Sequence, residues 1–384
     1  MPDFDESPEH RQLRELVRDI TAAHGPAEYA DHARRAAPED GLWSDLGKAG
    51  CIGINVPEEY GGGGAGMQEL ALVATESAAA GCPLLLLLVS SAIGVEVLRR
   101  HGSAEQRQEW LPRLADGSVK LSFAITEPDA GSNSHRISTT AERDGADYVI
   151  TGGKYYISGI DQSAAVLTVA RTGVDADTGR GRLTLFLVPT DTPGLSWTAI
   201  DVAAQIPDRQ FTVHFDRVRV PASAVVGAPN DLGPLFDGLN PERITAAAIA
   251  VGIGRFVLSA AARYVSDRSV WGVPTGAHQA VAHPLARAKV EVEVAAVATA
   301  RAAWLHDAGR PAGEAANMAK FAAAEAAGHA VDAAIQAHGG NGLSADFGLL
   351  PMWGMARLLR IAPVSSEMIL NYVAQHSLGL PRSY

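Results

Sequence analysis

Length, composition and charge exclude several classes of protein at once. The chain has 384 residues, 47% of them hydrophobic and 20% charged, so it can bury a large core and is not disordered by composition. Its formal net charge of −11 argues against nucleic acid as the main partner, because a phosphate backbone requires a basic face.

Residues 1–117 are predicted to form an N-terminal helical domain. Three of the first six residues are acidic and no apolar run follows them, so we expect no signal peptide. Apolar residues from Leu13 to Ile20 then recur at helical spacing. The most apolar stretch, 83–89, is far shorter than the roughly 20 residues that span a bilayer. We therefore expect a cytoplasmic protein with no membrane partner.

The cysteines and glycines of this region predict neither a metal site nor a dinucleotide site. Cys51 and Cys82 are too few for a disulfide framework or a cysteine-based metal site, and the histidines show no ligand spacing. Residues 61–66 match the pattern G-x-G-x-x-G, but that motif requires a preceding buried strand in a βαβ unit. Here a helical region precedes it, so we expect a flexible turn and no metal.

Residues 118–226 are predicted to form a central β domain. Runs at 147–153, 165–170 and 183–188 are rich in strand-forming residues and bounded by Gly, Pro and Asp. The first of them is expected to pass into a turn at its two glycines. Apolar residues alternate with polar ones at 211–215, as in a half-buried strand. Because no helical segment intervenes, the spacing predicts an antiparallel sheet or barrel.

Residues 227–384 are predicted to form a helical bundle. Long alanine-rich runs such as 244–265 and 289–306 contain almost no helix breakers. Helices, sheet and helices in this order define a multi-domain α+β chain.

One helix of this bundle is expected to begin at Asn240, with Asn240 as N-cap and Pro241 as first helical residue. Glu242 then lies in the first turn, either as a carboxylate that complements the helix dipole or as a general base. The spacing alone does not choose between these roles.

Three further segments carry polar or aromatic groups suited to a ligand. Residues 123–132 combine a strand-like run with a tight turn and offer hydroxyl and backbone N–H groups, although the residues alone favour a plain hairpin turn. Arg268 could bind a phosphate and Trp271 could stack on a ring. Taken one at a time, these two residues and the segment 336–340 are more typical of surface salt bridges, core positions or helix caps.

Taken together, the segments resemble the acyl-CoA dehydrogenase family. The similarity lies, in the family's order, at 54–62, 125–132, 153–159, 268–272 with Gln279, and 336–342. The resemblance implies an N-terminal helical domain, a central β-barrel-like domain and a C-terminal four-helix bundle. It also implies FAD as cofactor, an acyl-CoA substrate, an electron-transfer flavoprotein as partner and a homotetramer built as a dimer of dimers.

The resemblance assigns roles to matching positions. It implies that Thr126 and its neighbours bind the flavin edge, that Tyr156 and Ser158 flank the ring, and that Arg268 and Gln279 reach the cofactor across a dimer interface. Arg243, Ser132 and Val364 are the implied substrate contacts. The full implied FAD-binding set is Phe123, Ile125, Thr126, Gly131, Ser132, Tyr156, Ile157, Ser158, Arg268, Trp271, Gln279, Gln336, Gly339, Gly340, Ser365 and Glu367.

The catalytic base is implied by a departure from the commonest pattern of the family. The usual glutamate of the C-terminal segment falls on Pro363, which carries no proton acceptor. A minority of the family places the glutamate at the start of the first bundle helix, before an arginine, and Glu242-Arg243 matches this arrangement. The resemblance therefore implies that Glu242 is the base, with opposing effects of burial and of the helix N-terminus on its pKa.

Two other functions stay open at this point. The absence of a carboxylate at Pro363 permits a non-catalytic partner subunit of a heteromeric enzyme. The fold is also compatible with an oxygen-using flavoenzyme. The acyl chain and the pathway do not follow from the sequence.

Overall fold

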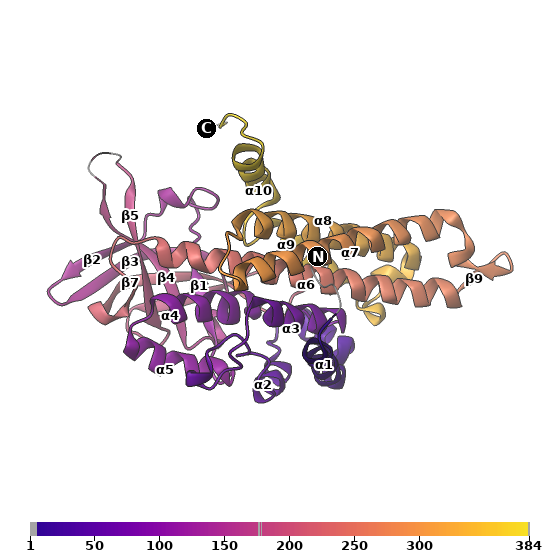
Figure 1. Ribbon diagram of the computed structural model, residues 1–384, viewed down its shortest axis with the longest axis horizontal. Coiled ribbons are helices and arrows are strands. Elements are labelled where there is room, and N and C mark those ends of the chain that lie inside the picture. Colours follow the sequence, from indigo (N-terminus) through magenta and orange to yellow (C-terminus); the bar gives the residue numbers. More distant parts are fainter. Residues whose placement is uncertain (1–5, 176, 178, 383–384) are drawn as a thin grey trace.

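The computed structural model of the chain describes residues 6–175, 177 and 179–382. In chain order it contains a layer of helices, a sheet and a long helical bundle (Figure 1). This order confirms the predicted α+β architecture. In the view of Figure 1 the sheet lies at one end of the molecule, and the bundle extends away from it above the N-terminal helices.

The N-terminal region is helical, as expected. Serine caps start two of its helices: Ser7 Oγ accepts the N–H of His10, and Ser103 exchanges hydrogen bonds with Gln106 in a capping box. The glycine-rich segment 61–66 is a loop between η1 and α3, as expected for a turn. The elements are α1 (Pro8–Arg35), α2 (Asp40–Lys48), η1 (Glu58–Tyr60), α3 (Met67–Ala79), the π-helical η2 (Leu87–Gly94), α4 (Val95–His101) and α5 (Ala104–Ala115).

The central sheet is mixed, and this corrects the expected antiparallel barrel. Its strand order is β6-β7-β3-β2-β4-β5-β8, with β1 beside β4, and β4 runs parallel to both β1 and β2. The chain reaches β4 through the β2–β3 hairpin, so a parallel pair forms without a crossover helix. The order has two ends, and the described strands do not close into a barrel. The strands are β1 (Leu121–Ala124), β2 (Thr140–Asp144), β3 (Asp147–Ser158), β4 (Ala165–Val174), β5 (Gly181–Pro189), β6 (Leu195–Ile200), β7 (Gln210–Pro221) and β8 (Val225–Val226).

The expected turn at Gly152-Gly153 is also wrong. Strand β3 continues through both glycines to Ser158, and a register shift against β7 absorbs the irregularity. A β-bulge of this kind bends a strand without ending it.

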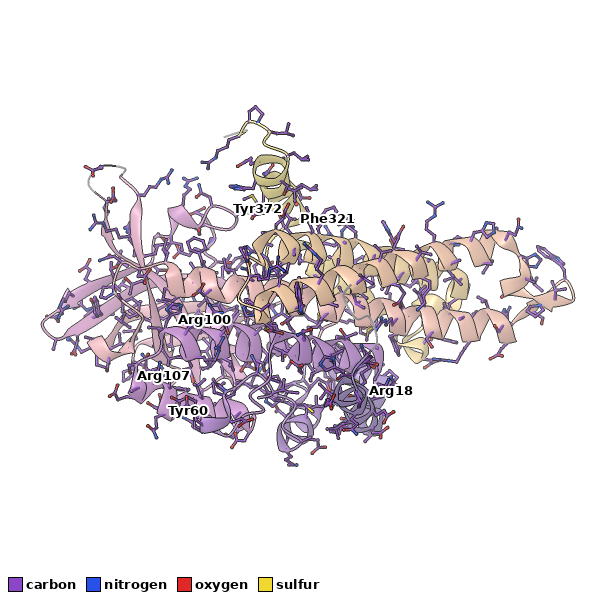
Figure 2. The ribbon with its side chains drawn as sticks, in the orientation of Figure 1. Arg18, Tyr60, Arg100, Arg107, Phe321 and Tyr372 are labelled. Carbon is purple, nitrogen blue, oxygen red and sulfur yellow. The ribbon has the colours of Figure 1, made fainter. Side chains whose placement is uncertain are left out.

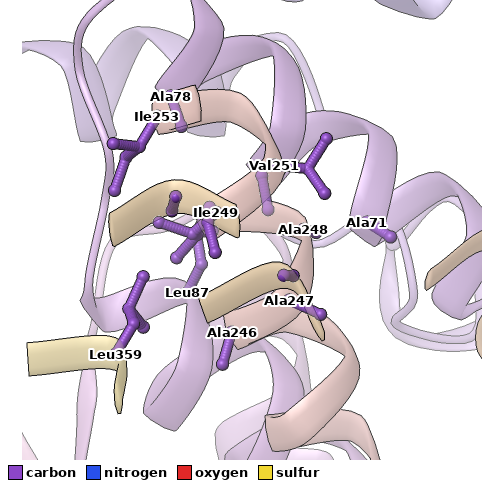
Figure 3. Close-up of a cluster of buried hydrophobic side chains, with 14 of the residues drawn as sticks. Ala71, Ala78, Leu87, Ala246, Ala247, Ala248, Ile249, Val251, Ile253 and Leu359 are labelled. Carbon is purple, nitrogen blue, oxygen red and sulfur yellow. The ribbon is translucent and has the colours of Figure 1, made fainter. Parts of the chain in front are cut away.

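The bundle consists of long helices whose small side chains permit close approach. Alanines of α6 pack with α3, η2 and α9 in one continuous core that also includes much of the N-terminal layer (Figure 3). The helices are α6 (Gly233–Asp267), α7 (Gln279–Asp307), α8 (Gly313–His338), α9 (Leu349–Ile361) and α10 (Ser366–Tyr372), and a short hairpin of β9 (Ser269–Val270) and β10 (Val273–Pro274) joins α6 to α7.

Helix α6 differs from the sequence expectation in two ways. It begins at Gly233, with Pro234 in its first turn, so Asn240 is not the N-cap and Pro241 lies inside the helix. Among the described helices it is also the one that is long and apolar enough to cross a membrane, a feature that the short stretch 83–89 did not indicate. Its most apolar window is 78% buried within the protein, as in a core helix.

Candidate active site

Glu242 is a buried carboxylate on α6. Its side chain lies beyond the first helical turn, because the helix begins at Gly233, and there the helix dipole has little effect. Glu242 is 7% exposed, and burial raises its pKa to about 8 against the opposing positive charges of Arg243 and Lys320. Among the described residues no hydrogen bond contributes to this pKa. Burial therefore outweighs the helix terminus, and the carboxyl group can accept a proton near neutral pH.

Arg243 lies beside it with an incomplete set of partners. One terminal nitrogen, Nη1, donates to Asn240 Oδ1 at 3.2 Å. The Nε atom is buried and has no hydrogen-bond partner among the described residues. Burial lowers the pKa of Arg243, opposed by the charge of Glu242. A buried guanidinium N–H without an acceptor costs free energy, and a ligand carbonyl or phosphate oxygen would satisfy it.

The segment between α9 and α10, residues 362–365, is held on α8 at two points. Lys320 Nζ donates to the carbonyl oxygen of Val364 at 2.6 Å. Glu325 Oε1 accepts from Ser366 Oγ at 3.1 Å and from Arg360 Nε at 2.8 Å. Figure 2 labels Phe321 on α8 and Tyr372 on α10, which mark the two helices concerned. The predicted contact Val364 is thus fixed near Glu242 through Lys320, which acts on both.

Sequence reasoning missed Lys320 and Glu325. Lys320 lies among the buried alanines of α8 and is itself 1% exposed. A lysine on the apolar face of a helix is the signal that could have found it. Ser365 caps α10 by accepting the N–H of Met368 at 3.3 Å, whereas the side chain of Glu367 is exposed.

The predicted flavin-edge segment lies at the end of β1. The carbonyl of Thr126 accepts the N–H of Tyr155 at 2.9 Å, and the carbonyl of Ile125 accepts from Lys154 Nζ at 3.1 Å. The tight turn, expected at residues 130–132, falls at residues 127–130, and Gly131 and Ser132 follow it and are exposed. Phe123 lies within β1 and is partly buried. The segment is thereby held against β3, which carries the other predicted ring contacts.

Tyr156 occupies a strained position at a second register shift of β3, between Lys154 and Ile157. Its φ is +58°, a conformation that a bulky L residue rarely adopts, and its side chain is 52% exposed. The ring of Tyr155 meets it edge-on with centroids 4.5 Å apart. Next along the strand, Ile157 is buried and Ser158 Oγ donates to Gln210 Oε1 at 2.9 Å. Strain retained at an exposed aromatic residue is typical of a functional site.

A second group of predicted residues meets at the far end of the bundle. Arg268 and the segment 336–340, which includes Gln336, Gly339 and Gly340, line one cavity of about 390 Å³. Tyr264 and His338, in the same lining, stack with ring centroids 4.2 Å apart.

The hairpin between α6 and α7 extends past this cavity. Trp271 stands on the hairpin and is 88% exposed, and Gln279 is exposed at the start of α7.

The two groups lie far apart within one chain. At about 1.5 Å per residue, Glu242 and Arg268 are separated by roughly 39 Å along α6. One chain therefore places its candidate base roughly 39 Å along α6 from its candidate nucleotide-binding end.

A larger cavity, of about 630 Å³, contains none of the predicted residues. It lies between the loop before α3 and the end of α7, and its charged groups pair with one another. Burial opposes the charge of Glu96, but His306 and Arg99 outweigh it and lower its pKa to about 2. Asp307 and Glu96 correspondingly raise the pKa of His306 to about 9 despite its burial. These ion pairs join the N-terminal helices to the bundle.

Among the described residues, three side chains lie close enough together to be candidate metal ligands, although no metal was expected. Potential ligand atoms of Glu28, His32 and Glu39 lie within 4.8 Å of one another. His32 Nδ1 and Glu39 Oε1 are 2.9 Å apart, so a hydrogen bond between them already accounts for part of the grouping.

Comparison with known proteins identifies the class to which these features belong. The N-terminal, middle and C-terminal domain profiles of acyl-CoA dehydrogenases match residues 7–118, 122–218 and 235–378. The chain belongs to the acyl-CoA dehydrogenase family, whose members are oxidoreductases with FAD as cofactor.

Individual relatives agree with this assignment. The chain is 55% identical to acyl-CoA dehydrogenase FadE12 of Mycobacterium tuberculosis over 99% of each protein. It resembles the structure of glutaryl-coenzyme A dehydrogenase in complex with glutaryl-CoA, with a TM-score of 0.93, 28% identity, and coverage of 100% of this chain and 98% of the other. The FADH2 complex of glutaryl-CoA dehydrogenase from Mycobacterium smegmatis gives a TM-score of 0.91 at 25% identity, covering 99% and 96%.

Proposed function

We propose that the chain catalyses α,β-dehydrogenation of an acyl-CoA thioester to the trans-2-enoyl-CoA, with Glu242 as the base. The observation that carries this proposal is the buried Glu242 carboxyl, whose pKa burial raises to about 8. Such a group binds a proton readily at neutral pH, as a base for a weakly acidic α-carbon requires. FAD, when bound, accepts the β-hydrogen as hydride.

The residues around Glu242 have supporting roles in this proposal. Arg243 offers its unpaired Nε to an oxygen of the CoA thioester. The backbone N–H of Val364 donates to the thioester carbonyl and stabilises the negative charge that develops there as the α-proton leaves. Ser132 lies at the substrate side of the flavin-edge turn.

The proposed cofactor contacts divide into two sets. The ring set comes from one subunit, and the adenosine and pyrophosphate set, at the far end of the bundle, comes from a neighbouring subunit. The separation of roughly 39 Å along α6 supports this division. The ring set is Phe123, Ile125, Thr126, Gly131, Ser132, Tyr156, Ile157, Ser158, Ser365 and Glu367, and the other set is Arg268, Trp271, Gln279, Gln336, Gly339 and Gly340.

We also propose a homotetramer built as a dimer of dimers. An apolar stripe on α7 supports it: Val290, Val294 and Val297 recur at helical spacing and are 60–64% exposed in the single chain. Trp304 continues the stripe, and Trp271 is exposed at the hairpin. Self-association would cover these side chains.

The remaining assignments of the proposal follow the family. The chain divides into domains at 1–117, 118–226 and 227–384, and an electron-transfer flavoprotein reoxidises the flavin. The buried free thiols of Cys51 and Cys82 are compatible with a reducing, cytoplasmic location. The acyl chain is left open.

An anaerobic titration of the holoenzyme with a panel of acyl-CoAs, followed by flavin absorbance, tests the proposal. We expect one class of acyl chain to bleach the flavin. Glu242→Gln should keep FAD and lose bleaching, whereas the exposed Glu314→Gln on α8 serves as a matched control with unchanged reduction.

Other outcomes identify the alternatives. A yellow protein that no thioester reduces, and that becomes active only with a partner chain, is the non-catalytic subunit. Hydrogen peroxide released in turnover identifies the oxygen-using enzyme. Full activity of Glu242→Gln would refute the assignment of the base.

A further inference from the structure

Lys320 is a buried cation whose one hydrogen bond in the described chain reaches a distant backbone carbonyl. It is 1% exposed on α8, and its Nζ lies 2.6 Å from the Val364 oxygen, 44 residues further along the chain. An ammonium group carries three N–H donors, so this bond leaves two of them available.

The charges around Lys320 come from three helices. Glu242 and Arg243 lie on α6, Glu325 lies on α8 itself, and Glu367 lies on α10. Burial lowers the pKa of Lys320 to about 8, and Glu242 is the strongest of the charges that oppose this shift. For Glu242 the acting charges are Arg243 and Lys320. Each of the two buried groups therefore stabilises the ionised form of the other.

A purely structural role does not require this residue. A buried ion costs several kcal/mol in desolvation, and an apolar side chain of similar volume often packs without loss of stability. The rest of the buried face of α8 is mostly alanine, which packs the helices without any charge. Glu325 already fixes the same segment through Ser366 and Arg360.

We propose that Lys320 is a positioning residue of the active site, which fixes the Val364 backbone for the thioester and favours the ionised form of Glu242. This rests on the proposed function of Glu242 as base. Lys320 itself exchanges no proton with the substrate in this scheme. It acts on Val364 through a hydrogen bond to the backbone carbonyl and on Glu242 through its positive charge.

Replacement of the charge should change the protonation of Glu242. In Lys320→Met, an uncharged side chain of similar length, the carboxylate of Glu242 loses a nearby cation, so its pKa should rise by about one unit or more. The rate of flavin reduction at pH 7 should then fall about tenfold or more, and its pH profile should move to higher pH by the same interval. Lys320→Arg keeps the positive charge and should leave the midpoint of the pH profile near that of the wild type. Its KM should rise if the Val364 backbone shifts.

A control variant on the same helix distinguishes the anchoring of the segment between α9 and α10 from the effect of the Lys320 charge. Glu325→Gln weakens the hold on Ser366 and Arg360, but Glu325 does not act directly on the pKa of Glu242. Because Glu325 also favours the charged form of Lys320, we expect this variant to lower the rate or raise KM and to move the pH midpoint less than Lys320→Met does.

Infrared titration of the oxidised holoenzyme provides a readout that needs no turnover. The carboxyl C=O band of Glu242 is identified by its loss in Glu242→Gln and followed against pH in the wild type, Lys320→Met and Lys320→Arg. An upward shift of the midpoint in Lys320→Met alone supports the proposal. An unchanged midpoint overturns it, even if the variant is less active. If no acyl-CoA reduces the wild-type flavin, the proposed function fails, yet the infrared midpoints still decide whether Lys320 controls Glu242.

Discussion

Glu127 and Lys154 form an ion pair sealed beneath the predicted flavin-edge turn. Their side chains are 2% and 0% exposed, and Lys154 Nζ lies 2.9 Å from Glu127 Oε1. Burial would raise the pKa of Glu127, but hydrogen bonds from Ser138 and Thr139 and the charge of Lys154 outweigh it and lower the pKa to about 2. The pair joins the turn to β3, so it holds Thr126 and Tyr156, two of the predicted ring contacts, in a fixed relation.

Loss of one member of this pair should destabilise the protein strongly. Glu127→Gln leaves Lys154 buried without its counter-charge, and we expect a loss of about 3–5 kcal/mol. In Glu127→Gln/Lys154→Met both charges are removed, so the double variant should lose less than the sum of the single variants. Urea unfolding of the holoenzyme measures these differences, and strict additivity would contradict the coupling.

Ionisation of Glu242 should lower the stability of the folded protein at pH values above the ordinary pKa of a glutamate. Its pKa in the folded chain, about 8, exceeds the usual value of 4.5, so folding takes up a proton and stability falls as pH rises from about 4.5 towards 8. Glu242→Gln removes this cost and should stabilise the protein at pH 8 by on the order of 2–4 kcal/mol, with little effect at pH 4. Thermal melts of both proteins across pH check this. Equal differences at pH 4 and pH 8 would show that the carboxyl group is not the cause.

Tyr156 should show the same conflict between stability and function. Its φ of +58° is strained for tyrosine and unstrained for glycine, so Tyr156→Gly should relieve about 1 kcal/mol of backbone strain while it removes the aromatic plane. We expect weaker FAD retention with little loss of apoprotein stability. Dissociation constants for FAD and apoprotein melting temperatures test the two parts separately, with Tyr156→Phe as the control that should keep FAD.

The sequence predicted those features that depend on local pattern and missed those that depend on distant contacts. The order of helices, sheet and helices follows from periodicity and composition. The parallel pairing of β1 with β4 could not be predicted from local sequence. Whether two strands run parallel depends on which strands become neighbours in the folded sheet. The start of α6 was placed at Pro241 because Asn240 and Pro241 match a helix start, whereas Pro234 occupies the first turn in the structure.

The candidate site shows the same division. Glu242 and Arg243 were found because the chain there resembles a family with a known motif. Lys320 was missed because its partner, the carbonyl of Val364, carries no side-chain signal and lies 44 residues away. The strain at Tyr156 arises from a register shift between β3 and β7, which no single segment encodes.

The separation of Glu242 from Arg268 predicts a specific pattern of complementation between subunits. If each active site takes its base from one subunit and Arg268 from the neighbour, Glu242→Gln and Arg268→Ala are each inactive alone. In a mixed dimer one site then carries both substitutions and the other carries neither. We expect co-expressed, differently tagged variants to regain about half of the flavin reduction of a wild-type dimer. A mixed dimer of tagged and untagged Glu242→Gln is the control and should stay inactive. If both residues acted within one chain, every site in the mixed dimer would contain one substitution, and no activity would return.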